Sequence, residues 1–81
     1  MGWTSYVQID NDELRFGLKE GAVYRWDKDG NYGEVIFDHY ELSILNRIGI
    51  RWVDSNGHKA GSTYVNANGS RDGRETWSKK V

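Results

Sequence analysis

Apolar and polar residues alternate along most of this chain, which is the pattern of short, half-buried β-strands. Between residues 13 and 19, for example, Leu14, Phe16 and Leu18 fall on one side and charged side chains fall mostly on the other. The pattern predicts five to seven short antiparallel strands, located at residues 3–9, 13–19, 22–26, 32–37, 50–53, 60–65 and 74–79.

One turn pattern, Asx-x-Asx-Gly, occurs three times, at residues 27–30, 54–57 and 66–69. The first Asx side chain can accept a hydrogen bond from the backbone two residues on, and glycine readily takes the left-handed conformation that closes a hairpin. We therefore expect Gly30, Gly57 and Gly69 to have positive φ angles and to close hairpins.

A different period appears at residues 38–49. Asp38 and Glu41 match a capping box, in which the first residue caps a helix and the fourth reaches back to it. Tyr40, Ile44 and Ile48 then recur at helical spacing, and Gly49 is a typical helix end. This segment predicts one short helix over residues 39–48.

Residues 1–81 are thus expected to form a single small domain of the α+β class, mostly antiparallel β, as a small sheet or a partly open barrel with one helix. Residues 13–26 are either a hairpin or one bent strand. In the second case the order is three strands, a helix and two strands, which is the order of an oligonucleotide-binding (OB) barrel. Edge strands in so small a sheet can pair with a second copy, so a homodimer is also considered.

Composition narrows the function classes. The chain has no cysteine, so disulfides and cysteine-based metal sites are excluded. It also has no proline. Eleven aromatic residues are more than one narrow core holds comfortably, so some should be exposed. No apolar run approaches the ~20 residues of a membrane span, and the expectation is a soluble, cytoplasmic protein without a membrane partner.

The net charge is −1, but the charges are unevenly distributed. Residues 1–45 carry nine acids and four bases, a net charge of −5, whereas residues 46–81 carry seven bases and three acids, a net charge of +4. The asymmetry indicates either an interaction surface or two halves that neutralise each other within the fold.

Two weak signals for chemistry have simpler explanations. Asp27, Asp29 and Asn31 have the spacing of the first calcium-loop ligands, but the flanks predict strands and a hairpin turn is favoured. His39 and His58 are a conceivable acid–base pair for a small nuclease or hydrolase, yet nothing in the sequence brings them together. We therefore predict no enzyme activity, no metal and no cofactor.

The favoured function is a non-enzymatic binding module for another protein with an acidic surface, such as a small inhibitor or adaptor; phage and mobile elements often encode chains of this size. Single-stranded nucleic-acid binding by an OB-like domain is the alternative, and carbohydrate binding is the third possibility. The predicted binding residues lie in the basic half of the chain and are Arg51, Trp52, His58, Lys59, Arg71, Arg74 and Trp77.

Overall fold

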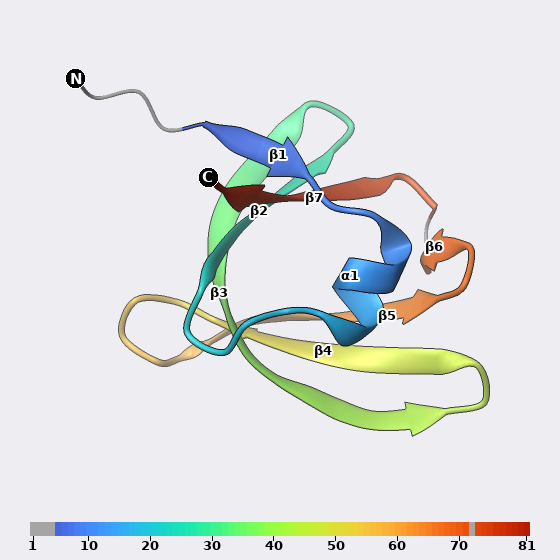
Figure 1. The fold of residues 1–81 in the computed structure, drawn as a ribbon. Coiled ribbons are helices and arrows are strands. Elements are labelled where there is room, and N and C mark those ends of the chain that lie inside the picture. The colour runs from blue at the N-terminus through green and yellow to red at the C-terminus, as the bar shows by residue number, and fades with distance from the viewer. Residues whose placement is uncertain (1–4, 72) are drawn as a thin grey trace.

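The computed structural model describes residues 5–71 and 73–81, including all of their side chains except those of residues 42 and 43 (Figure 1). Within these residues seven strands form one antiparallel sheet in the order β1-β7-β2-β3-β4-β5-β6. The fold class predicted from the sequence is confirmed. The elements are β1 (Tyr6–Gln8), α1 (Asn11–Phe16), β2 (Val23–Lys28), β3 (Asn31–Ile44), β4 (Arg47–Val53), β5 (Lys59–Asn66), β6 (Gly69–Ser70) and β7 (Glu75–Lys80).

The sheet curves around its own interior, and α1 lies on the open side of the curve, where it packs against β5 (Figure 1). Strand β7 lies between β1 and β2, so the two ends of the described chain are neighbours in the sheet. Tyr6 pairs with Lys80, and Tyr24 pairs with Lys79. The predicted first strand began at Trp3, which lies outside the described residues.

The repeated turns behave as predicted. Asp29 and Gly30 form a two-residue loop between the paired residues Lys28 and Asn31, and both loop residues have positive φ, at 51° and 87°. Gly57 and Gly69 also have positive φ, at 82° and 120°. These turns are fixed by local chemistry, which is why the sequence reveals them.

The helix is at residues 11–16 and not at 39–48, so both that prediction and the strand predicted at 13–19 are wrong. Asp10 caps α1, because its carboxylate accepts a 2.8 Å hydrogen bond from the Glu13 backbone N–H. Leu14 is buried and Phe16 is 65% exposed. The spacing of Leu14 and Leu18, four residues apart, fits a helical face as well as it fits strand alternation.

Residues 39–48 belong instead to β3, a two-residue turn and β4. The pairing register shifts between Phe37 and His39, as in a β-bulge. The shift places Phe37 and Tyr40 on the same inner face although they are three residues apart, and their ring centroids are 4.8 Å from each other. The helical spacing of Tyr40, Ile44 and Ile48 does not mark one buried face, because Ile44 is 57% exposed and Ile48 belongs to the next strand, β4.

The OB order is not present, because the helix follows the first strand and residues 13–26 are neither one bent strand nor a hairpin.

Tyr40 connects the helix and the segment after it to the sheet through hydrogen bonds. Its hydroxyl donates to the backbone carbonyl of Leu14 and accepts from the backbone N–H of Leu18, both at 3.0 Å. Burial raises the pKa of this hydroxyl above its ordinary value.

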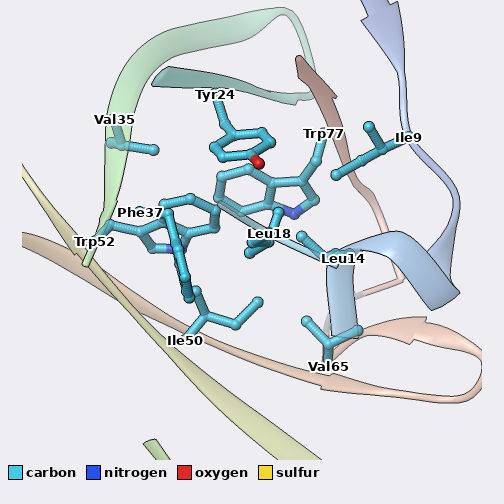
Figure 2. Packing of buried hydrophobic residues seen from close by; sticks show 10 residues of the cluster. All are labelled: Ile9, Leu14, Leu18, Tyr24, Val35, Phe37, Ile50, Trp52, Val65 and Trp77. Atoms are coloured by element: carbon cyan, nitrogen blue, oxygen red, sulfur yellow. The ribbon is translucent and has the colours of Figure 1, made fainter. Parts of the chain in front are cut away.

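The core is aromatic, as expected for a small domain without disulfides. Trp52 and Trp77 are 2% and 4% exposed, and their rings stack with centroids 4.5 Å apart. Tyr24 and Phe37 meet Trp52 edge-on (Figure 2). Aliphatic side chains from both the sheet and the helical segment complete the cluster, namely Ile9, Leu14, Leu18, Val35, Ile50 and Val65.

Candidate binding face

One side of the sheet gathers aromatic and charged side chains from four strands. Direct cross-strand partners share a face, and residues two apart on a strand do so as well. Arg25 pairs with Glu34 and Ser78, while Asp27 pairs with Tyr32. The register therefore places five side chains on the outer face, opposite the buried Tyr24 and Trp77. We call them the Tyr–Arg face: Tyr6, Arg25, Tyr32, Glu34 and Lys80.

Arg25 is the centre of this face. Its guanidinium lies over the ring of Tyr32 at 4.1 Å from the centroid, and the ring of Tyr6 is 5.6 Å away on another side. Asp27 contributes a third contact, an ion pair of 3.2 Å between its Oδ1 and Arg25 Nη2. Stacking on an aromatic ring and a carboxylate together fix the orientation of a side chain that would otherwise be mobile.

Glu34 organises the neighbouring part of the face. Its carboxylate accepts a hydrogen bond from the Tyr6 hydroxyl and lies 3.5 Å from Lys80 Nζ. Exposed ion pairs contribute little to folding stability. The hydrogen bond to Glu34, however, keeps the Tyr6 ring beside Arg25. Tyr32 remains 65% exposed. The face therefore presents a large aromatic ring and an ordered guanidinium to the solvent.

Part of this face can be found in the sequence. The Asp29–Gly30 turn fixes the β2–β3 register, and that register places Tyr32 diagonally across from Arg25. The contribution of Tyr6 cannot be found that way, because it depends on β7 being inserted between β1 and β2. The predicted binding residues all lie in the second half of the chain and include none of this set.

The two tryptophans among the predicted binding residues are in the core. Trp52 and Trp77 stack on each other inside the curved sheet and have almost no exposed surface. A stacking platform for a nucleic-acid base needs an exposed ring, so neither residue can serve as one in this structure. Both occupy the inward position of their strand, which alternation alone does not distinguish from the outward one.

The basic residues of the second half lie beside acids from the first half. Arg51 Nε is 3.6 Å from Asp38, and Arg74 Nη1 is 3.4 Å from Asp29. Two further ion pairs cross between the halves in the same way, Lys79 with Glu13 and Lys80 with Glu34. The uneven charge along the chain is thus largely neutralised by folding, which is the second of the two interpretations given above.

The remaining predicted binding residues lie at the surface. Arg71 follows β6 and is exposed, whereas His58 ends the exposed β4–β5 loop and Lys59 is the exposed first residue of β5. Asp54 organises that loop. Its Oδ1 accepts hydrogen bonds from the backbone N–H groups of His58 and Asn56, at 3.0 and 2.8 Å, and these bonds lower the pKa of the carboxyl group.

The calcium interpretation of residues 27–31 finds no support in the geometry. Asp27 lies against Arg25 and Asp29 lies against Arg74, so the two carboxylates are directed to different cations. Across residues 5–71 and 73–81, no three His, Asp or Glu side chains gather in a way that suits a metal ion.

The two histidines are on separate elements. His39 is on β3, and its Nδ1 lies 2.7 Å from the Asp38 carboxylate. His58 is at the β4–β5 loop and takes part there in the Asp54 turn. No hydrogen bond connects the two side chains within the described part of the chain, and the structure therefore adds no observation in favour of an acid–base pair.

A second exposed surface is the apolar end of the β3–β4 hairpin. Ile44 is exposed, and Leu45, in the turn, is 86% exposed with a positive φ of 59°. The ring of Tyr64 on β5 is also partly exposed and has Arg47 above it. The sequence pattern placed Ile44 on one face of the predicted helix, so this surface was missed.

Comparison with known proteins gives no match to a family model, to a curated protein or to a solved structure. Among the described residues, no helix is long and apolar enough to cross a membrane. The function must therefore be inferred from the geometry of this chain alone.

Proposed function

We propose that this protein is a non-enzymatic binding module that binds another protein through the Tyr–Arg face. The observation that carries the proposal is the arrangement of Arg25, which is held over Tyr32 and beside Tyr6 while Tyr32 stays largely exposed. Tyrosine and arginine are enriched at the residues that dominate protein–protein binding energies. Ordering them before binding reduces the entropy lost on association.

The charges of the face favour a protein partner over nucleic acid. The two cations of the face, Arg25 and Lys80, are paired with two anions, Asp27 beside the face and Glu34 within it. A phosphate backbone would meet these carboxylates at close range, and nucleic-acid interfaces are strongly positive. A protein surface with carbonyl groups and apolar side chains can contact both the guanidinium and the tyrosine rings. We therefore expect a partner surface with both polar and apolar groups, instead of the acidic surface expected from the sequence.

The proposal is tested by site-specific photo-crosslinking. A photoreactive phenylalanine analogue is placed at position 32, and a matched control protein carries it at position 64, where Tyr64 is also exposed but lies outside the Tyr–Arg face. Both proteins are expressed in the native host and irradiated. We expect a discrete crosslinked partner from position 32 that is absent from position 64.

The partner found in this way is then purified and its affinity is measured for three variants. Tyr32→Ala and Arg25→Ala should each weaken binding by about tenfold or more, as expected for central interface residues. Arg71→Ala, an exposed residue away from the face, should leave the affinity unchanged. Full affinity in both face variants, together with a loss on charge reversal of Arg51 and Arg74, would move the site to the basic residues predicted from the sequence.

A nucleic-acid partner is examined with the same variants. Binding of a generic oligonucleotide that falls steeply between two salt concentrations, and that depends on Arg25, would contradict the proposal of a protein partner. If the crosslinked partner is a second copy of this chain, sedimentation should show a dimer that Tyr32→Ala dissociates.

A further inference from the structure

The helix α1, strand β6 and the start of β7 approach one another on the open side of the curved sheet (Figure 1). Residues of these elements line a polar pocket of about 160 Å³. Asn11 from α1 and Gly69 from β6 form adjoining parts of its wall. The Asn11 side chain lies so close to Gly69 that a Cβ atom there would be 3.6 Å from its amide. The pocket is separate from the Tyr–Arg face and uses none of its five side chains.

Two buried polar groups at this pocket have no hydrogen-bond partner among the described residues, namely Ser70 Oγ and Trp77 Nε1. Ser70 is 7% exposed and Trp77 is 4% exposed. Figure 2 shows the indole nitrogen of Trp77 on the ring edge that faces Ile9 and Leu14, which also line the pocket. A buried donor without an acceptor is costly, and such groups are rare in folded proteins.

Trp52, which stacks on Trp77 in the same core, has an indole N–H that is hydrogen-bonded. Trp52 Nε1 donates to the hydroxyl of Thr63 at 3.1 Å. Trp77 is buried to a similar degree, but its N–H has no partner in the described part of the chain and lies on the side of Leu14, which lines the pocket (Figure 2). The unpaired N–H is therefore not a general feature of this aromatic core.

The lining indicates the chemistry of a ligand. Amide and hydroxyl groups both donate and accept hydrogen bonds, and a carboxylate accepts them. Among the described residues that line the pocket there is no Lys, Arg or His, so an anionic ligand would lack a counter-charge. A volume of about 150 Å³ holds one six-membered ring. The polar wall residues are Gln8, Asn11, Asn68, Ser70, Glu75 and Thr76.

We propose that this pocket binds one neutral polyhydroxyl ring, such as a single sugar residue, with a ligand oxygen accepting from Trp77 Nε1–H and a ligand hydroxyl paired with Ser70. Sugar hydroxyls, like the amides of the wall, serve as both donors and acceptors. Reaching the two buried groups requires a small opening between β6 and α1, which contact each other through the Asn11 side chain.

The indole N–H of Trp77 provides a direct readout by NMR. The intact, ¹⁵N-labelled protein is titrated with glucose, galactose, mannose, N-acetylglucosamine and myo-inositol, and its indole signals are assigned with Trp-to-Phe variants. At least one compound should shift the Trp77 signal saturably, with a Kd in the millimolar range, and leave the Trp52 signal nearly unchanged. Ser70→Ala should weaken this binding by about tenfold.

Controls separate a sugar site from other occupants. Thr63→Ala should alter the Trp52 signal without changing the sugar affinity. Sodium acetate and N-methylacetamide serve as anionic and amide probes, and a saturable response to either of them but to no polyol would overturn the proposed ligand class. A Trp77 indole that contacts only water in a nuclear Overhauser experiment and does not respond to any of these compounds would show an internal hydration site instead. Equal affinity in the Ser70→Ala variant would also contradict the proposal.

Discussion

Trp77 stacks on Trp52 with ring planes only 10° apart, although two strands, β2 and β3, lie between their own strands in the sheet. The contact therefore crosses the interior of the curved sheet instead of running along its surface. It joins β7 to β4 directly and holds the curvature of the sheet from the inside.

Removing either ring of this stacked pair should strongly lower the stability of the folded protein. Trp77→Ala should lower the free energy of unfolding by about 3–5 kcal/mol, because a large buried side chain is lost and a cavity is left. The milder variants Trp77→Phe and Trp52→Phe should each abolish the exciton couplet of the stacked indoles in circular dichroism. Trp26→Phe is the control, since Trp26 lies outside the stack and the couplet should persist.

The helix cap is at Asp10, and a matched pair of variants tests this. Asp10→Ala should destabilise the protein by about 1 kcal/mol, because the Glu13 N–H loses its acceptor. Asp38→Ala, in the capping-box sequence at residues 38–41, should cost less than about 0.5 kcal/mol, because the contacts of Asp38 within the described residues are exposed ion pairs. Urea denaturation measures both, and the reverse ranking would contradict the assignment of the helix.

Gly30 is needed for its backbone conformation and not for space. Its φ is 87°, and a Cβ atom there would have no neighbour within 4 Å. Gly30→Val should therefore cost more than about 1 kcal/mol through strain alone, whereas Gly30→Asn should cost less because asparagine tolerates this region. Equal stability of the Val variant and the wild type in thermal unfolding would show that the turn relaxes to another conformation.

Asp54 should contribute stability that depends on pH. Hydrogen bonds from the His58 and Asn56 backbone lower its pKa below the ordinary value of 3.8, so the folded state favours the charged form. This contribution is present above pH 3.8 and is lost as the pH falls through the lowered pKa of the folded protein. Asp54→Asn keeps an acceptor oxygen but cannot titrate. The difference in unfolding midpoint between wild type and this variant should change below pH 3.8 and stay constant above it.

Features that depend on neighbouring residues could be predicted from the sequence. The three hairpin turns need only an Asx side chain and a glycine at fixed spacing, and all three glycines have the expected positive φ. The fold class follows from these turns and from the strand alternation between them. Their local origin also explains why the β2–β3 register, and with it the Arg25–Tyr32 contact, could have been derived.

Features that depend on distant pairing could not be predicted. Two capping-box sequences, beginning at Asp10 and Asp38, look alike, and only the first begins a helix. The second lies in β3, where pairing with β4 and a bulge outweigh the local helix signal. The Tyr–Arg face was missed for the same reason, since Tyr6 reaches Arg25 only through the position of β7.

The position of β7 also has a consequence for biosynthesis. Residues 75–80 leave the ribosome after every strand they pair with, and β1 has no other partner within the described sheet. Until they emerge, the nascent chain carries an unpaired strand at its beginning and a Trp52 ring with one bare face. The domain therefore cannot complete its core until β7 has been synthesised and has paired between β1 and β2.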